Sequence, residues 1–245
     1  MKKIKLLYLP FLLSGAITAC NSGNSSTSTA SAPYTINVPM TNSKVNLNPS
    51  LFSLTTTGTL ATAYPSNVTV SFDASQEALI VGFNNTNDLQ VNQNNYTQDN
   101  SAMWNQEVFE MFISPGSNTP TEYVEIEVNP NNALFSAQIT NPNGKGTENT
   151  ATLFDGRTDG IQTSVNKSST SWEGTITFPL TILGPLTNSY RVNFFRIVSL
   201  TAESSTTSWA CTSTSCEYLA WSPTFSGASP AFHIPQYFGQ LNLIP

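Results

Sequence analysis

The chain alternates between short apolar runs and polar turns, a pattern typical of a β-protein. In residues 67–73, Val68, Val70 and Phe72 occupy alternate positions and therefore share one face of an extended strand. Similar runs, separated by Asn, Gly, Pro and Ser, cover residues 78–83, 107–113, 123–129, 133–139, 160–165, 171–178, 190–198 and 237–244. Only residues 179–184 suggest a helical turn. The pattern predicts an all-β fold, an antiparallel sandwich or barrel with at most short helical turns.

One carboxylate interrupts the run VFEMFI at residues 108–113, which is otherwise apolar. Such a run predicts a strand covered on both faces. A buried Glu110 is costly unless it is paired, hydrogen-bonded or kept for a ligand. Two roles stay open for it: contact with a ligand, or a buried ion pair with Arg196, which also stands among apolar residues. Glu107 lies on the opposite face of the strand, because successive side chains alternate.

Two further carboxylates, Glu125 and Glu127, share one face of the strand at 123–129. Glutamates on one face could serve glycoside hydrolysis. No distinctive motif accompanies them, however, so a solvated sheet face is the favoured interpretation. His233 is the only histidine, and the chain has no G-x-S-x-G nucleophile elbow. The sequence therefore predicts a protein that is not an enzyme.

The first 33 residues do not resemble the rest. Lysines at positions 2, 3 and 5 precede an apolar stretch at 6–13 that is too short to span a bilayer, the layout of an export signal over residues 1–19. The small residues before Cys20 resemble a bacterial lipobox, which predicts a lipid on Cys20 and anchoring to a membrane of the cell envelope. Asn21 favours the outer membrane. An ordinary cleaved signal is the alternative. Residues 20–33 form a Ser/Thr/Asn-rich tether, and residues 34–245 form one domain.

The charge of the chain argues against nucleic-acid binding, and its cysteines predict a disulfide. Beyond the signal, six basic residues stand against fifteen acidic ones, a formal charge of −9. Without a basic cluster, the chain is a poor candidate for binding nucleic acid. Cys211 and Cys216 lie in one polar loop, and an exported protein meets oxidising conditions. We therefore expect a small loop-closing disulfide.

Indole side chains stand near the ends of predicted strands. Trp104 precedes the strand that carries Glu110, and Trp209 and Trp221 lie in a region rich in Ser, Thr and Pro. An indole beside an acidic sheet face suits a sugar, whose C–H face packs on the ring while its hydroxyls bind polar side chains.

Five blocks in order, WNQEVFEMFISPG, YVEIEVNPNNALF, RVNFFRI, YLAWSPT and FHIPQYFGQL, resemble the carbohydrate-binding module family 9-like domains of the DOMON-like superfamily. The resemblance implies a jelly-roll-like sandwich that holds a saccharide in a surface slot, often with structural calcium. It places Trp104 and Glu110 where a stacking ring and a sugar-binding carboxylate are expected, and Trp221 as the second ring. Further polar contributors under this resemblance are Glu125, Asn129, Asn131 and Arg196. Calcium ligands cannot be selected from the loop carboxylates Asp73, Glu77, Asp88 and Asp99.

Two other functions remain open. The chain could be a structural or host-facing surface lipoprotein in which Glu110 and Arg196 hold the sandwich together. It could also be a haem-binding electron carrier, because some DOMON-like domains ligate haem through Met and His. Met103, Met111 and His233 are available for this, although no C-x-x-C-H attachment motif is present.

Overall fold

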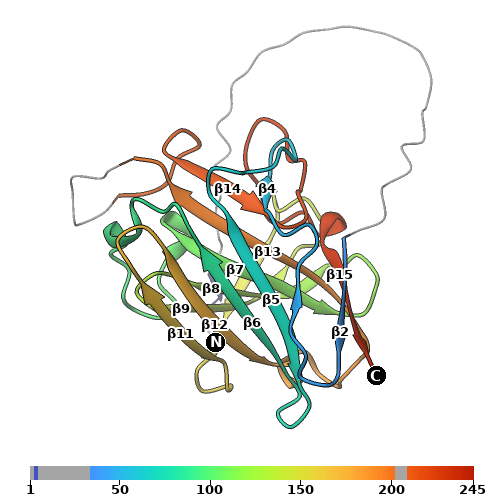
Figure 1. The fold of residues 1–245 in the computed structure, drawn as a ribbon. Helices are drawn as coiled ribbons and strands as arrows, with labels where there is room; N and C mark the ends of the chain where they lie inside the picture. Colours follow the sequence, from blue (N-terminus) through green and yellow to red (C-terminus); the bar gives the residue numbers. More distant parts are fainter. Residues whose placement is uncertain (1–2, 5–33, 202–208) are drawn as a thin grey trace, which may run out of the picture.

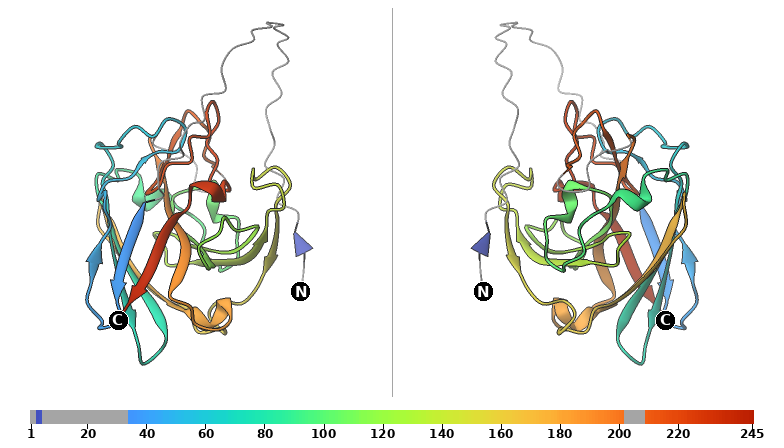
Figure 2. Two further views of the ribbon diagram at one scale, coloured as in Figure 1. Left: turned by 90° about the vertical axis from the view of Figure 1, so that its right-hand side faces the viewer. Right: turned by 90° about the vertical axis from the view of Figure 1, so that its left-hand side faces the viewer.

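The computed structural model describes residues 3–4, 34–201 and 209–245. Their strands form two sheets that pack face to face as a sandwich (Figures 1 and 2). The predicted all-β antiparallel fold is confirmed, with one parallel strand pair at the edge. Within the described ranges, no helix is both long enough and apolar enough to cross a membrane. The segment predicted as an export signal, apart from Lys3 and Ile4, the predicted tether and Cys20, at which a lipid is expected, lie outside the described residues.

The smaller sheet has five strands. Its order is β11 (Gln162–Lys167), β12 (Trp172–Pro179), β6 (Ala78–Asn85), β5 (Ser66–Asp73) and β3 (Val45–Asn46), all antiparallel. The alternation in β5 sends every second residue into the core, as the sequence predicts.

The larger sheet has ten strands. Its main path is β1 (Lys3–Ile4), β10 (Thr150–Leu153), β9 (Leu134–Thr140), β8 (Glu122–Val128), β7 (Val108–Pro115), β13 (Ser189–Ser199), β14 (Cys216–Ala220) and β4 (Ser53–Leu54). The strand β15 (Gly239–Ile244) pairs with the first part of β13, and β2 (Thr35–Pro39) runs parallel to β15. Four short 3₁₀ turns complete the described elements: η1 (Val91–Gln93), η2 (Met103–Asn105), η3 (Leu180–Leu183) and η4 (Pro235–Tyr237).

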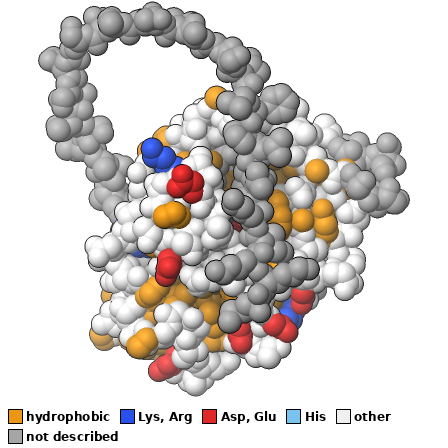
Figure 3. Space-filling view, turned by 180° about the vertical axis from the view of Figure 1, so that it is seen from behind, with side chains coloured by type: hydrophobic (Ala, Val, Ile, Leu, Met, Phe, Trp, Pro, Cys, Tyr) orange, Lys and Arg blue, Asp and Glu red, His pale blue; other side chains and the backbone are white. Residues whose placement is uncertain are grey.

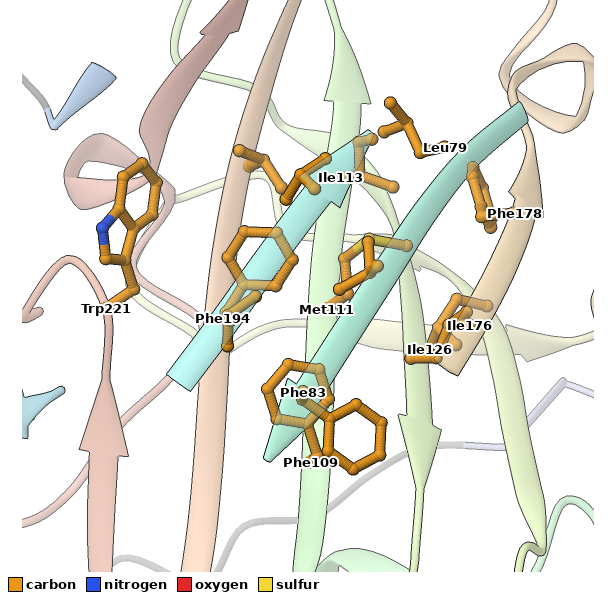
Figure 4. Close-up of a cluster of buried hydrophobic side chains, with 14 of the residues drawn as sticks. Leu79, Phe83, Phe109, Met111, Ile113, Ile126, Ile176, Phe178, Phe194 and Trp221 are labelled. Carbon is orange, nitrogen blue, oxygen red and sulfur yellow. The ribbon is translucent and has the colours of Figure 1, made fainter. Parts of the chain in front are cut away.

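The central strands of the larger sheet are covered on both faces. Every residue of β7 except its last is buried, which confirms the expectation from its apolar run. Phe109, Met111 and Ile113 point toward the smaller sheet and form the main core with Phe83 and Phe194 (Figure 4). The alternate residues of β7 point to the other side, which we call the covered face.

Trp221 belongs to the main core. Its side chain is fully buried and packs against Phe194 and Tyr34 (Figure 4). The indole lies so close to Gly239 that a Cβ there would come within 2.3 Å of the ring. Glycine is needed at this position because any side chain would overlap the indole.

A second hydrophobic cluster fills the covered face. Its buried aromatic members are Phe112, Tyr123, Phe135, Phe195, Trp209, Phe232 and Phe238. They come both from the sheet and from the loops that lie over it. The predicted disulfide between Cys211 and Cys216 is present and joins one of these loops to β14.

Candidate functional site

Three carboxylates meet on the covered face. Glu110 of β7 lies directly opposite Glu127 of β8, and Glu125 is two residues away on the same strand. One carboxylate oxygen from each residue lies within 4.8 Å of the other two. The side chains are almost fully buried, with exposures of 1%, 2% and 0% for Glu110, Glu125 and Glu127. The prediction of a solvated face for Glu125 and Glu127 is therefore wrong, because a second layer covers this side of the sheet. We call these three residues the glutamate cluster.

Burial raises the pKa of all three carboxyl groups, and for Glu125 it does so to about 8. The negative charge of Glu125 further raises the pKa of Glu110, and both neighbours raise that of Glu127. Three carboxylates this close cannot all be ionised in a water-poor environment, so the cluster retains protons at neutral pH.

The surface is acidic as well. The face of the molecule seen in Figure 3 carries more acidic than basic side chains.

The glutamate cluster has unused hydrogen-bonding capacity. Both oxygens of Glu127 and one oxygen each of Glu110 and Glu125 are buried and accept no hydrogen bond from an N–H or hydroxyl group of the described residues. The carboxyl groups of Glu125 and Glu127 share a hydrogen bond with each other when one of them keeps its proton. Buried polar atoms are normally satisfied, so such a group indicates a role beyond packing. Protonated carboxyl groups can donate and ionised ones can accept, which together suits a ligand rich in hydroxyls.

Arg196, considered as an ion-pair partner for Glu110, does not contact it. Arg196 points into the space between the sheets, where its guanidinium contacts Asp88 at 3.2 Å and Glu107 at 3.6 Å. It also donates to the backbone carbonyl oxygens of residues 64 and 65. The hypothesis of a buried Glu110–Arg196 pair is therefore wrong, because the two side chains project from opposite faces of the larger sheet. For the same reason the structure does not bring Arg196 to the glutamate cluster. The expectation that Glu107 and Glu110 lie on opposite faces is confirmed.

Two indoles border the covered face at the end where β7 begins. Trp104, in η2, is partly exposed and meets Phe135 edge to face at 5.2 Å between ring centroids. Trp209 is 7% exposed, and its indole N–H donates to the carbonyl of Gln93 at 2.9 Å. Trp104 thus packs against the covered face, to which Glu110 also points. Trp221, by contrast, lies in the main core on the other side of the sheet and does not face Trp104 across a slot.

Amide side chains fix the long loop at residues 86–107 beside these indoles, and those of Asn129 and Gln106 are buried. Asn129 donates to Asn94 and to the carbonyl of Tyr96, and Asn131 donates to the carbonyl oxygens of the same two loop residues. Gln106 donates to the carbonyl of Trp209. The structure therefore shows Asn129 and Asn131 engaged in holding the loop rather than directed at the glutamate cluster.

A neutral histidine lies at the other end of the cluster. The Nδ1 atom of His233 is 2.7 Å from the Tyr123 hydroxyl, and its Nε2 atom is 4.0 Å from Glu125. Burial lowers the pKa of His233 to about 3, so the ring is uncharged at neutral pH and its contact with Glu125 is not an ion pair. Met111 points into the main core, on the opposite face from His233. One haem could not be ligated by both residues.

The loop carboxylates considered for calcium do not converge. Asp73 accepts from Ser75 and Gln76, Asp88 contacts Arg196, and Asp99 pairs with Arg157. Within the described part of the chain, only the glutamate cluster brings three candidate ligand atoms together. Its oxygens are of the type that calcium prefers, so these are the residues that would hold such an ion.

A model of a known family matches most of this fold. The model described as "Carbohydrate-binding family 9" covers residues 53–243. The chain belongs to carbohydrate-binding family 9. Family membership agrees with the resemblance carried by the five sequence blocks, and it supports carbohydrate binding as the general function.

Solved structures and one curated protein are similar to this family 9 chain. A candidate carbohydrate-binding protein from Bacteroides uniformis is 16% identical with a TM-score of 0.55, over 80% of this chain and 88% of its own. A family 9 module from Caldicellulosiruptor kristjanssonii, in complex with glucose, is 15% identical with a TM-score of 0.52, over 86% and 95%. These likenesses show a shared fold. An "Extracellular protein" from Arthroderma benhamiae is 34% identical over 109 residues, which is 41% of this chain and about half (49%) of that protein.

The sequence did not single out every residue that the geometry brings together. Glu127 was not among the candidate ligand-binding residues, although its position two residues from Glu125 placed it on the same face. Its register opposite Glu110 depends on the pairing of β7 with β8, which a single sequence does not give. Trp209 was recognised only as an indole near the end of a strand.

Proposed function

We propose that this protein is a non-catalytic carbohydrate-binding protein whose saccharide site is formed by the glutamate cluster and Trp104. Family 9 membership supports the ligand class. The observation that carries the location is the set of buried carboxyl oxygens that receive no hydrogen bond from an N–H or hydroxyl group of the described residues, on the same face as a partly exposed indole. Glucose is the first ligand to test, because the related module from Caldicellulosiruptor kristjanssonii forms a complex with it.

In this proposal the indole and the carboxyl groups contribute different parts of the binding energy. The ring of Trp104 packs on the apolar C–H face of a pyranose. Glu110, Glu125 and Glu127 exchange hydrogen bonds with its hydroxyls, accepting where they are ionised and donating where they keep a proton. Because the three side chains are buried, a sugar reaches them only when the atoms above the cluster give way. That displacement reduces affinity, since part of the binding energy is used to open the site.

Titration calorimetry of the purified protein with glucose and with cellotriose, a glucose trimer, tests the proposal. Trp104→Ala and Glu110→Gln should each weaken binding about tenfold or more, equivalent to about 1.4 kcal/mol. Glu173→Gln is the matched control, because Glu173 is an exposed glutamate on the smaller sheet. Equal affinity in all three variants would place the site elsewhere. Absence of binding to either sugar would favour the structural surface role instead.

The non-catalytic part of the proposal has a separate test. It rests on the binding character of the family and on the lack of a recognisable catalytic motif. Prolonged incubation of the protein with cellotriose should release no shorter sugars, as measured by chromatography. Release of glucose that disappears in Glu125→Gln or Glu127→Gln would instead make the glutamate cluster catalytic.

We further propose that the protein is held at the bacterial cell envelope, at the outer membrane, by a lipid on Cys20. The support is the lipobox-like segment before Cys20 and the polar tether after it. Metabolic labelling with a fatty acid should mark the wild-type protein and not Cys20→Ser, and membrane fractionation should release the variant. Unlabelled wild-type protein would show that the signal is cleaved in the ordinary way.

A further inference from the structure

A surface hollow lies away from the glutamate cluster. It has a volume of about 470 Å³ and opens where the β7–β8 and β9–β10 connections meet η4. The residues that matter for its chemistry are Thr121, Asn143, Lys145, Phe225, Gln236 and Tyr237. Its size falls in the range typical of small-molecule sites.

Buried polar side chains hold the walls of this hollow in place. Arg191, which is 6% exposed, donates from its guanidinium to the carbonyl oxygens of Ser117, Pro235 and Gln236 and thereby connects the β7–β8 turn to η4. Asn141 donates to the carbonyl of His233 at 2.9 Å. The same Asn141 side chain accepts from the backbone of the β9–β10 loop at residue 146. Three connections that are distant in sequence are thus fixed to one another.

Phe225 is presented to solvent in an unfavourable backbone conformation. Its φ angle is +48°, a region that side-chain-bearing residues other than Asn and Asp rarely adopt, and 54% of the residue is exposed. The neighbouring backbone N–H groups of residues 226 and 227 donate to the carbonyl oxygens of Thr55 and Thr56. The ring lies over Gly58, where a Cβ would approach it to 2.4 Å. An exposed aromatic ring is therefore held in a defined position rather than left on a free loop.

The aromatic rings of Phe225 and Tyr237 line the hollow together with polar side chains. Phe225 and Tyr237 meet at 5.5 Å between centroids with an interplanar angle of 62°. Around them are the exposed amides of Asn143 and Gln236 and several hydroxyls, and no Asp or Glu lines the hollow. The Lys145 ammonium forms no ion pair with any described residue. Ring faces bordered by amide and hydroxyl groups match the C–H face and hydroxyls of a sugar.

We propose that this hollow is a second saccharide-binding site, which takes a pyranose unit against Phe225 and Tyr237. It shares no lining residue with the glutamate cluster. Its existence therefore does not depend on the site proposed above. A protein with both sites binds a long or branched glycan at two points, which raises its avidity without further contacts.

Nuclear magnetic resonance titration of isotope-labelled full-length protein with glucose and with cellotriose separates the two sites. The backbone signals of residues 143–145, 224–226 and 236–237, which line the hollow, should shift with millimolar sugar. Phe225→Ala should weaken this response about tenfold, equivalent to about 1.4 kcal/mol. Phe225→Tyr, which keeps a ring, should retain it. Leu89→Ala is the control for loss of an exposed apolar side chain, since Leu89 is 71% exposed and lines neither site.

The outcomes for the two sites can be told apart. Shifts at the hollow that persist in Trp104→Ala would support the second site even if the glutamate cluster binds no sugar. Unchanged signals at residues 143–145, 224–226 and 236–237 with both sugars would overturn the second site, whatever happens near Trp104. A response that Phe225→Ala leaves intact would also overturn it, because the ring would then play no part.

Discussion

Glu110 and Glu127 occupy directly opposed positions on two neighbouring antiparallel strands, and both are buried. Like charges in this arrangement repel each other strongly, since little water is present to screen them. The pair is tolerable because the pKa of each carboxyl group is raised by burial and by the charge of its neighbours. Protonation therefore determines how much these residues destabilise the fold.

We predict that Glu125→Gln makes the protein more stable at pH 8 and leaves it nearly unchanged at pH 4. Below the ordinary pKa of 4.5, Glu125 is protonated in both the folded and the unfolded chain. Between pH 4.5 and about 8 only the folded form keeps the proton, so the free energy of unfolding falls as the pH rises. The gain in the variant at pH 8 should be on the order of a few kcal/mol. Thermal unfolding of both proteins from pH 4 to 9 measures it.

His233 contributes a slope of the opposite sign, and the comparison cancels it. Its pKa is lowered to about 3 in the folded protein, so it destabilises the fold progressively as the pH falls from its ordinary value of 6.5. Both proteins keep this histidine, so their difference reports Glu125 together with the effect of its charge on the pKa of Glu110 and Glu127. A difference that does not grow between pH 4.5 and 8 would contradict the raised pKa.

Replacing Arg196 by Met should destabilise the protein by about 3–5 kcal/mol. The substitution leaves Asp88 and Glu107 buried without their positive partner. Arg157→Met is the matched control, because the Arg157–Asp99 pair is substantially exposed and such pairs contribute about 1 kcal/mol or less. Urea unfolding curves give both values. Equal losses would show that the burial of Arg196 has no energetic consequence.

A side chain at position 239 should disturb the main core through Trp221. Gly239→Ala places a Cβ against both the indole and the backbone oxygen of Tyr34. We expect a loss of about 1–3 kcal/mol from overpacking. Trp221→Phe in the same chain should recover part of that loss, and a double-mutant cycle of unfolding free energies measures the coupling.

The affinity for glucose is a second property to measure in Trp221→Phe. Trp221→Phe should leave binding of glucose unchanged, because Trp221 lies on the opposite side of the sheet from the glutamate cluster. Weaker binding in a variant that remains folded would instead support Trp221 as a second sugar-stacking ring, the role that the sequence resemblance implies.

Removing the disulfide should affect both stability and binding. The double substitution Cys211→Ser and Cys216→Ser opens a loop with a sequence separation of 5, which should lower the free energy of unfolding by about 2 kcal/mol. The Cys211 backbone N–H also donates to the carbonyl of Asn105, next to Trp104. A looser loop should therefore weaken glucose binding, as measured by calorimetry. Unchanged glucose affinity in the double variant would show that the disulfide does not contribute to sugar binding.

Most of the fold could be predicted because it depends on local patterns. The alternation at 67–73 and the apolar run at 78–83 correspond to β5 and β6, and the suggested turn at 179–184 corresponds to η3. The strands β2, β10 and β14 were not predicted. Each has at most five residues, and even the alternation of β2 rests on only two apolar positions, Ile36 and Val38, so their pairing partners rather than their own sequences define them.

The candidate site was less predictable because it depends on distant pairings. The sequence identified Glu110 as an unusual residue and placed Trp104 beside it. It could not show which carboxylates lie opposite Glu110, nor that Arg196 would point to the other side of the sheet. It also gave no indication that loops from the second half of the chain cover Glu125. Register and covering layers are properties of the folded chain as a whole.

The parallel pairing of β2 with β15 has a mechanical consequence. The domain begins at the upstream end of β2 and finishes at the downstream end of β15, so a force that separates the two ends pulls these neighbouring strands in opposite directions along their length. All the hydrogen bonds between them then resist together instead of opening one by one. If the chain is held at its N-terminal end while its C-terminal end is under tension, β2 and β15 must slide past each other before the sandwich can unfold.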